Sequence, residues 1–196
     1  MRRDLISSAL AIVAITVVFG LAYPLVVTGI AQVAFHGRAN GSQIERGGKL
    51  VGSSLLAQDF KRDKRYFQPR PSTATGYDPA ATAFTNLGPN SKAARDTFAA
   101  SLAAYLKLER PYVPGLAPAR VPVDAVTSSA SGVDPHISPA NAAIQAHRIA
   151  GVRGLGLAQV RTLIADHTDG RFLGVIGEPG VNVLELNLAL DRLTSR

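Results

Sequence analysis

The sequence places a carboxylate, an imidazole and a hydroxyl within five residues, at Asp134, His136 and Ser138. These are the groups of a serine hydrolase, in which the base must lie between the acid and the nucleophile. Side chains within a single turn rarely reach that arrangement. In the structural interpretation, Gly132 permits a turn, Asp134 accepts hydrogen bonds from loop N–H groups and Ser138 caps a helix. We favour this interpretation, with His136 contacting the core or a partner, and keep an exported hydrolase as the alternative.

Other catalytic signatures are missing from the sequence. Gly47-Gly48-Lys49 lacks the upstream glycine and the following hydroxyl of a phosphate-binding loop, and no GxSxG pattern occurs. The four histidines include no pair at i and i+4 and no HExxH motif, which argues against a zinc hydrolase. The absence of cysteine excludes disulfides, thiolate catalysis and sulfur-ligated zinc. We therefore expect no catalytic residue, no metal ligand and no directly bound cofactor.

Several polar and aromatic residues lie where the chain should be rigid. Arg70 stands between two prolines, and Gln145 and Arg148 lie in the helix that is predicted to follow Ser138. Side chains held this firmly either bind a partner or brace a loop, and both interpretations stay open. Aromatic residues near Arg70 are predicted to be core, with an exposed docking patch as the alternative. They are Tyr66, Phe67, Tyr77 and Phe84.

Hydrophobic periodicity predicts the helices that would position these residues. Large apolar side chains recur at i, i+4, i+7 and i+8 from Phe98, and either Asn90 or Ser91 can cap the helix that they define. Ser138 and Pro139 open a second helix, which Gly151 is expected to stop. Helices are therefore predicted at 91–108, 138–150 and 157–167.

Strand signals are weaker. A short strand followed by a turn or a short helix fits 49–60, and a strand is predicted at 171–176. Residues 181–193 are ambiguous, because their leucines alternate as in a strand, whereas a helix capped by Asn182 fits as well. These elements predict a single α+β domain at 49–196, with a juxtamembrane linker at 36–48.

An uncharged stretch of 31 residues, from Leu5 to Phe35, precedes the linker. A helix that spans a membrane needs about 20 apolar residues, and only a helix satisfies its own backbone hydrogen bonds in lipid. The stretch therefore predicts one transmembrane helix that tethers the domain. Pro24 removes a backbone donor and is expected to kink the helix unless neighbouring helices support it.

Two alternatives concern the fate and orientation of this helix. A cleaved signal peptide would fit the basic start at Arg2 and Arg3, but its apolar core has only about 7–15 residues. We therefore expect a retained anchor. Basic residues flank both ends of the stretch, so the positive-inside rule decides little. Because long domains translocate largely regardless of charge, we expect a cytoplasmic N-terminus and a domain outside the cytoplasm.

The net charge of +7 and the pI near 10.1 raise the question of nucleic-acid binding. The one dense basic run is Lys61-Arg62-Asp63-Lys64-Arg65, and no nucleic-acid-binding motif accompanies it. We therefore expect no nucleic-acid partner. The run is interpreted as a solvated face, with an anionic lipid surface or an acidic partner as the alternative.

Strings of residues along nearly the whole chain resemble the C subunit of Kdp-type potassium-transporting ATPases. The most specific is 131–139, SGVDPHISP. Small departures from the family pattern occur at Val133, at Gly180, where a larger residue is usual, and at Ala83-Phe84-Thr85. The other strings are Tyr66-Phe67, Arg70-Pro71-Ser72, Asn86-Leu87-Gly88-Pro89, Val121-Pro122, Asp124, Thr127-Ser128, Gln145, Arg148-Ile149-Ala150, Gly177-Glu178-Pro179 and 181–187.

The resemblance implies a non-catalytic accessory subunit of an ATP-driven potassium uptake complex in the bacterial inner membrane. Its partners would be a channel-like potassium-binding subunit, a P-type ATPase subunit and a small single-helix subunit. ATP and potassium would be bound by these partners, and the chain would assist assembly and raise the ATPase subunit's affinity for ATP. Helix packing is expected at Gly20, Pro24 and Gly29. Candidates for partner or structural contacts are Arg70, Asn86, Asp134, His136, Ser138, Gln145, Arg148 and Asn182.

Overall fold

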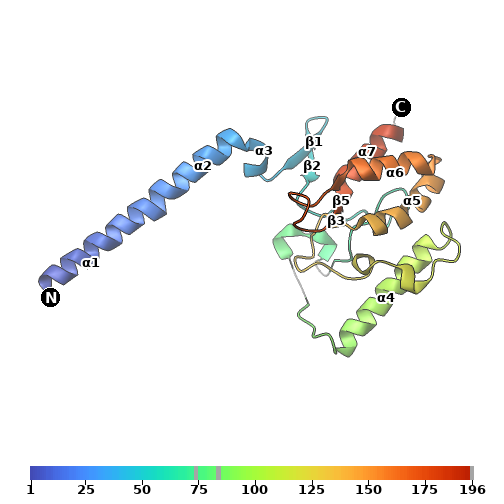
Figure 1. Ribbon diagram of the computed structural model, residues 1–196, viewed down its shortest axis with the longest axis horizontal. Helices are drawn as coiled ribbons and strands as arrows, with labels where there is room; N and C mark the ends of the chain where they lie inside the picture. The colour runs from blue at the N-terminus through green and yellow to red at the C-terminus, as the bar shows by residue number, and fades with distance from the viewer. Residues whose placement is uncertain (73–74, 83–84, 195–196) are drawn as a thin grey trace. The chain divides into compact units, whose positions relative to one another are not determined.

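The computed structural model describes residues 1–72, 75–82 and 85–194 (Figure 1). The chain forms two compact units, Met1–Ser53 and Ser54–Arg196. The second unit therefore begins slightly later than the expected domain, because the strand that starts at Lys49 pairs within the first unit.

A continuous helix fills most of the first unit (Figure 1). It consists of α1 (Arg2–Ile15), a π-helical segment (Thr16–Ala22) and α2 (Tyr23–Ala34). Its 33 residues reach a mean hydropathy of 2.5, long and apolar enough to cross a membrane. At about 1.5 Å per residue the helix is about 50 Å long, which exceeds the roughly 30 Å hydrocarbon core. The predicted transmembrane segment is therefore confirmed as a candidate span.

The π-helical segment lies directly before Pro24. Proline cannot donate a backbone hydrogen bond, and its ring would crowd the carbonyl four residues back, which is that of Gly20. The backbone N–H of Tyr23 instead reaches the Val18 carbonyl, five residues back. The helix that was expected to kink at Pro24 thus has a π-helical turn before this residue and is otherwise unbroken.

The segment predicted as a linker carries regular structure. It holds a short helix, α3 (His36–Ala39), and the strand β1 (Gln43–Arg46), which pairs antiparallel with β2 (Lys49–Ser53). Gly47 and Gly48 both have positive φ, 59° and 73°, as a tight hairpin turn requires. The predicted strand at the start of 49–60 is confirmed as β2.

The second unit is a mixed helical and sheet domain, so the predicted α+β class is confirmed. The three strands found among its described residues are short and antiparallel, in the order β3-β5-β4. Helices α5, α6 and α7 lie side by side, α5 and α7 contact β5, and α4 contacts α5 (Figure 1). The elements are α4 (Lys92–Glu109), β3 (His136–Ile137), α5 (Pro139–Arg153), α6 (Leu157–Asp166), β4 (Thr168–Asp169), β5 (Gly180–Asn182) and α7 (Val183–Thr194). Single 3₁₀ turns occur at Thr75–Tyr77, Pro79–Ala81, Pro118–Arg120 and Val123–Ala125.

The three predicted helices are present as α4, α5 and α6. Ser91 caps α4 and Ser138 caps α5, each accepting a hydrogen bond from the backbone N–H three residues on. Gly151 does not stop α5, because a glycine inside a helix costs only about 1 kcal/mol. The helix continues to Arg153 and ends at Gly154, whose φ of 66° is left-handed.

The predicted strand at 171–176 is wrong. Residues 172–176 form an exposed turn that a single bridge between Phe172 and Ile176 closes, and the paired strands flank it as β4 and β5. The ambiguity at 181–193 is resolved as the end of β5 followed by α7. Asn182 caps this helix, since its Oδ1 accepts a hydrogen bond from the Glu185 N–H at 3.2 Å.

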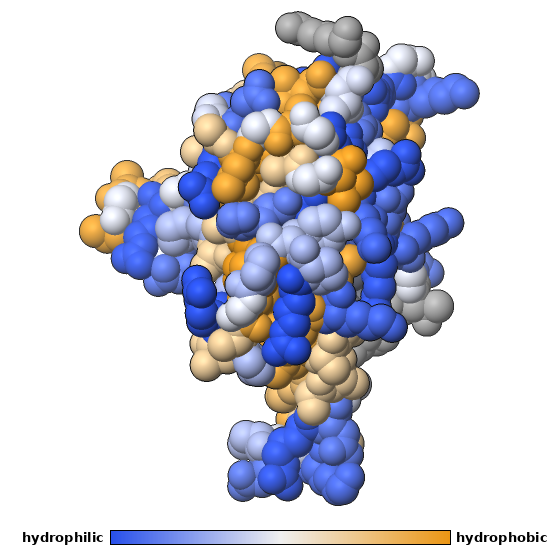
Figure 2. All heavy atoms as spheres, turned by 90° about the vertical axis from the view of Figure 1, so that its right-hand side faces the viewer, coloured by the Kyte–Doolittle hydropathy of each residue, from blue (hydrophilic) through white to orange (hydrophobic). Residues whose placement is uncertain are grey.

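The core lies among α5, α6, α7 and the sheet. Of the aromatic residues predicted to be core, Phe67 is fully buried, Tyr66 and Tyr77 are half-buried, and Phe84 lies outside the described residues. Hydrophilic residues predominate on the face shown in Figure 2, and hydrophobic ones form small groups there. The core cluster contains Phe67, Ile137, Ala142, Ala146, Ile149, Val160, Ile164, Val181, Val183, Leu186 and Leu190.

Candidate functional site

Helix α5 carries a polar stripe on its buried side. Asn141, Gln145 and Arg148 follow one another at i, i+4 and i+7, so they lie on one face of the helix. All three are buried. Buried polar side chains are stable only when they are hydrogen-bonded, so their partners show what the stripe does.

Arg148 is the centre of this stripe and is fully buried. Its Nε donates to Glu109 Oε1 at 2.9 Å, and its Nη2 donates to Gln145 Oε1 at 2.8 Å. Its Nη1 donates to the carbonyls of Lys64 and Tyr66, at 2.6 and 2.9 Å. The guanidinium thus joins α4, α5 and the loop that contains Lys64, and the brace interpretation of Arg148 describes these contacts.

Glu109 is the anionic partner of Arg148 and is also fully buried. Burial raises the pKa of Glu109, and the attraction of Arg148 opposes that rise. Its second oxygen, Oε2, has no hydrogen-bond partner among the described residues. A buried pair of this kind is weak evidence for net stability, because both charges lose their water on folding.

Two side-chain amides hold the backbone of consecutive loop residues. Gln145 accepts from the Gln68 N–H at 2.8 Å and donates to the Gln68 carbonyl at 3.1 Å. Asn187, on α7, does the same with Phe67, at 2.8 and 2.9 Å. The extended loop is therefore paired on both sides as a strand would be, with amides of two helices in place of neighbouring strands. Tyr105 OH extends this network, donating to Asn141 Oδ1 at 2.9 Å.

The Ser138 hydroxyl takes part in a helix cap. Its Oγ donates to Asp124 Oδ1 at 2.7 Å and accepts from the Asn141 N–H at 3.1 Å. Asp124 Oδ2 also accepts from the Ser138 N–H at 2.8 Å and from Asn141 Nδ2 at 2.9 Å. The Ser138 hydroxyl thus donates its hydrogen bond to Asp124 and not to His136. This geometry does not support the hydrolase alternative.

His136 instead belongs to a partly exposed charged cluster with Arg70, Asp134 and Asp169, which we call the His136 cluster. His136 Nε2 lies 3.2 Å from Asp169 Oδ2, and its Nδ1 lies 3.6 Å from Asp134 Oδ1. The other oxygen of Asp134 accepts from Arg70 Nη1 at 3.2 Å. Asp134 Oδ1 also accepts from the His136 backbone N–H at 2.9 Å, as the structural interpretation of this segment predicts.

The cluster shifts the pKa values of its members. The hydrogen bond to Asp134 raises the pKa of His136 despite partial burial, and Asp169 adds to the rise. Burial alone would raise the pKa of Asp134, but hydrogen bonds from His136 and the charge of Arg70 lower it overall. The cluster therefore favours the ionised form of Asp134 and the protonated form of His136.

Arg70 also braces a loop. Its Nη2 donates to the Ser128 carbonyl at 3.0 Å, and its Nε reaches the Thr127 carbonyl at 3.4 Å. Asn182 is buried, and besides capping α7 its Nδ2 donates to the Ser54 carbonyl at 2.8 Å. Asn86 is exposed and shares none of these contacts among the described residues. The candidates therefore divide into three groups. Ser138, Gln145 and Arg148 belong to the hydrogen-bond network of α5, and Arg70, Asp134 and His136 belong to the His136 cluster. Asn86 and Asn182 belong to neither.

The family described as KdpC, the c chain of K⁺-transporting ATPases, matches residues 5–192. The chain belongs to the KdpC family. A potassium-transporting ATPase KdpC subunit from Ralstonia nicotianae is 50% identical over 195 residues, which cover 98% of this chain and 93% of that relative. The subunit from Mycobacterium tuberculosis H37Rv is 48% identical over 194 residues, 98% of this chain and 100% of the relative. The subunit from Koribacter versatilis is 46% identical over 192 residues, which cover 97% of this chain and 95% of that relative. The resemblance predicted from the sequence strings is thus confirmed.

Four residues of this KdpC-family domain have structural roles that the sequence analysis did not assign. Glu109 carried a usable signal, because it lies three residues after Leu106 and seven after Leu102, on the apolar stripe of α4. A lone acid on a buried stripe predicts a buried basic partner. The other three, whose partners are distant in sequence, are Asp124, Asn141 and Asn187.

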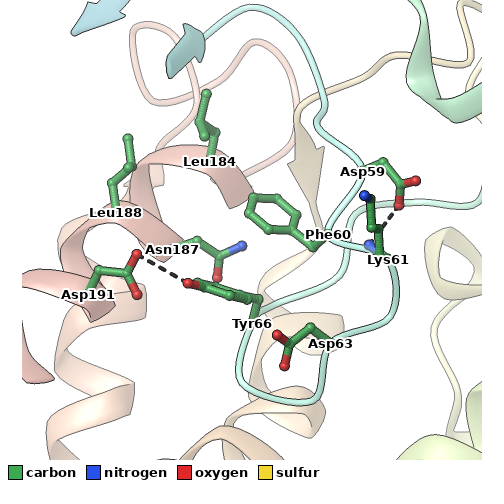
Figure 3. Close-up of a pocket in the computed structure, with 9 residues that line it drawn as sticks. All are labelled: Asp59, Phe60, Lys61, Asp63, Tyr66, Leu184, Asn187, Leu188 and Asp191. Atoms are coloured by element: carbon green, nitrogen blue, oxygen red, sulfur yellow. Dashed lines mark hydrogen bonds between the residues drawn. The ribbon is translucent and has the colours of Figure 1, made fainter. Parts of the chain in front are cut away.

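A shallow groove of about 320 Å³ lies between α7 and the loop at 59–66 (Figure 3). Leu184 and Leu188 of α7 and Phe60 and Tyr66 of the loop are among the residues that line it. Charged residues line it too, namely Asp59, Lys61, Asp63 and Asp191. Tyr66 OH donates to Asp191 Oδ2 at 3.3 Å, and the guanidinium of Arg153 lies 4.8 Å from the centre of the Tyr66 ring.

The basic run at 61–65 lies beside this groove. Within it, the hydrogen bonds from Arg65 lower the pKa of Asp63 to about 2. The four basic side chains are exposed, as expected for a solvated face. Among the described residues, no group of three or more His, Cys, Asp or Glu could hold a metal ion.

Proposed function

We propose that this chain is a non-catalytic accessory subunit of a high-affinity potassium-transporting ATPase, anchored in the bacterial inner membrane by its N-terminal helix. Its relatives are named potassium-transporting ATPase KdpC subunits. The observation that best supports the non-catalytic role is the hydrogen bond that the Ser138 hydroxyl donates to Asp124. Because the Arg148 and Gln145 side chains also bind backbone groups, the polar residues of the domain maintain its shape.

The partners in this proposal are a channel-like potassium-binding subunit, a P-type ATPase subunit and a small single-helix subunit. Small residues on the apolar helix support close helix contact. A Cβ atom added at Gly29 would meet nothing within 4 Å, and one at Gly20 would meet only Thr16 Cγ2 at 3.6 Å. Neighbouring helices approach closest at such positions. The helix would therefore pack against the potassium-binding subunit at Gly29, while Gly20, on roughly the opposite side of the helix, would allow a second close helix contact.

The proposed topology has a cytoplasmic N-terminus and a domain outside the cytoplasm, near the potassium entrance. Arg2 and Arg3 support a cytoplasmic start, and a domain of this length translocates largely regardless of its charge. In this orientation the domain cannot touch cytoplasmic ATP. ATP and potassium would be bound by the partner subunits, and this chain would hold no cofactor of its own.

Any effect on ATP affinity is then a coupling through the complex. Coupling free energies are reciprocal: if the chain raises the ATPase subunit's affinity for ATP by some factor, ATP must tighten the chain's association by the same factor. Measuring both affinities in detergent tests this part of the proposal. An effect on one affinity without the other would contradict coupling at equilibrium.

Assembly is tested by co-purification of the full chain with co-expressed partner subunits. A tagged chain should bring down the large multi-spanning subunits in detergent, and Gly29→Leu should weaken that recovery by filling the contact surface. Val26→Leu on the same helix is the matched control, because it changes the size of an already large side chain. Recovery of the wild-type chain as an isolated monomer would refute the assignment.

Topology is tested by labelling, because the chain contains no cysteine of its own. Ala103→Cys introduces a thiol on the exposed side of α4, and Asp4→Cys introduces one near the N-terminus. A membrane-impermeant maleimide added to intact spheroplasts should label the thiol at position 103 and leave the thiol at position 4 unlabelled until the membrane is opened. The reverse pattern would overturn the proposed orientation.

A further inference from the structure

The turn between β4 and β5 exposes an unusual concentration of apolar side chains. Phe172, Leu173, Val175 and Ile176 are 68%, 79%, 73% and 60% exposed, and no charged residue interrupts them. We call residues 172–176 the apolar loop. Isolated apolar residues are common on protein surfaces, whereas a contiguous apolar patch marks a site of contact with a protein or a membrane.

The apolar loop is an ordered turn. The Phe172 N–H donates to the Ile176 carbonyl at 2.8 Å, and the Ile176 N–H donates back to Phe172 at 3.0 Å. The N–H groups of Gly174 and Val175 donate to the carbonyls of Arg171 and Phe172, at 3.0 and 3.2 Å. A segment can enter lipid only if its backbone groups find partners within the protein, and these four N–H groups do so.

Charge at the base of the loop is balanced. Arg171 Nη2 donates to both carboxylate oxygens of Glu178, at 3.0 and 2.8 Å. The loop therefore consists of an uncharged tip above a neutral ion pair. This sequence of polarity matches the change from hydrocarbon to headgroups at a bilayer surface.

We propose that the apolar loop inserts into the interface of the lipid bilayer that holds the N-terminal helix. The inference uses the membrane anchoring of the proposed function and is independent of its orientation and partners. A protein partner would also cover apolar residues. Lipid is favoured for two reasons. The tip carries no polar side chain that could form specific hydrogen bonds with a protein partner, and the chain is already anchored in a membrane.

Ser54, the first residue of the domain, is hydrogen-bonded to β5, the strand that follows the apolar loop. Asn182, the last residue of β5, binds the carbonyl of Ser54, the first residue of the domain, at 2.8 Å. The first residue of β5, Gly180, is only two residues away along the strand, or about 7 Å. The polypeptide that arrives from the membrane helix therefore joins the domain close to the base of the loop.

The connection before Ser54 has little slack. The hairpin pairs Gln43 with Ser53, so its two ends lie together, and the tether consists of residues 35–42 and of any part of the helix that leaves the bilayer. Even fully extended, residues 35–42 span at most about 28 Å. A weakly apolar surface that is held near a bilayer benefits from a high effective concentration of lipid.

The test uses tryptophan fluorescence, because the chain has no tryptophan. The full chain with Phe172→Trp is reconstituted into phosphatidylcholine vesicles with or without bromine on the upper acyl carbons. Brominated lipid should remove most of the emission of this variant. Val123→Trp, at a position that is also 72% exposed but outside the loop, is the matched control and should keep its emission.

A second variant links quenching to the apolar surface. Val175→Asp, added to Phe172→Trp, should restore the emission, because a carboxylate resists transfer into the interface. Emission of Phe172→Trp that is equal in both lipids would overturn the proposal. So would blue-shifted, unquenched emission of the Phe172→Trp variant in the purified complex, which would assign the loop to a partner protein. Failure of the complex to form would contradict the proposed function, and the vesicle measurement on the chain alone would still decide on lipid contact.

Discussion

Arg148 Nε and Glu109 Oε1 meet at 2.9 Å, and neither side chain has any exposed area. The contact joins α5 to α4 across a separation of 39 residues. The same guanidinium binds two carbonyls of the loop at 64–66, so one side chain sets the positions of three segments. Changes at this pair should therefore affect the stability of the whole domain.

Arg148→Met should lower the free energy of unfolding by about 3–5 kcal/mol, because it leaves the Glu109 carboxylate buried without its charge partner. The double variant Arg148→Met/Glu109→Leu should recover much of this loss, since it removes both buried charges. Asp96→Asn is the control, because the Lys92–Asp96 pair is exposed and worth less than about 1 kcal/mol. Thermal unfolding of the purified full chain, followed by circular dichroism, provides the comparison. Equal stability of Arg148→Met and the wild type would contradict the role assigned to the pair.

Asn187→Ala should destabilise the domain by about 3 kcal/mol, because the Phe67 N–H and carbonyl would both lose their buried partner. Gln159→Ala is a suitable control, since Gln159 is exposed and bonds only the first turn of α6. It should cost about 1 kcal/mol or less. Urea unfolding midpoints of the two variants measure the difference. Equal shifts of the two midpoints would contradict the strand-like pairing of Asn187 with the backbone of Phe67.

Ser138→Ala should cost about 1–2 kcal/mol, because the first turn of α5 loses its cap and Asp124 loses a donor. Ser138→Thr keeps the hydroxyl and should retain most of the stability. Neither change is expected to alter partner recovery in detergent once the domain is folded at low temperature. A large loss with Ser138→Thr would show that the site needs more than a hydroxyl.

The His136 imidazole should titrate above its ordinary value of 6.5, because its hydrogen bond with Asp134 favours the protonated form. Its contribution to stability is then fully present below pH 6.5 and is lost as the pH rises through the folded value. The effect is under about 1 kcal/mol, since the cluster is partly exposed and screened. NMR titration of the ring should show a lower pKa in Asp134→Asn and a smaller drop in Asp169→Asn. An unchanged His136 pKa in Asp134→Asn would contradict this interpretation.

Gly180→Ala should disturb the same imidazole through a steric contact. A Cβ atom at Gly180 would lie 3.2–3.3 Å from three carbons of His136, closer than such contacts normally are. The ring must shift, which should weaken its bond to Asp134 and bring its pKa nearer to 6.5. Gly170→Ala is the control, because a Cβ atom there meets nothing within 4 Å. The titration would show identical curves for both variants if the contact were unimportant.

The local elements of this fold could be predicted because their causes are local. The apolar stretch at 5–35, the serine caps of α4 and α5 and the periodic stripe of α4 all depend on residues within a few turns of one another. The strand predicted at 171–176 was wrong for a related reason. Its apolar run satisfies the pattern of a strand, but without a partner strand it closes on itself as the apolar loop.

By itself, the sequence determined the membrane-type helix, the α+β composition and the family, since each depends on length, periodicity or identity along the chain. Only the tertiary structure decided what the polar residues do. Arg148 meets Glu109, Asn187 meets Phe67 and His136 meets Asp169 across 39, 120 and 33 residues. Buried polar groups must find partners wherever folding brings them, and no spacing along the chain encodes which partner that is.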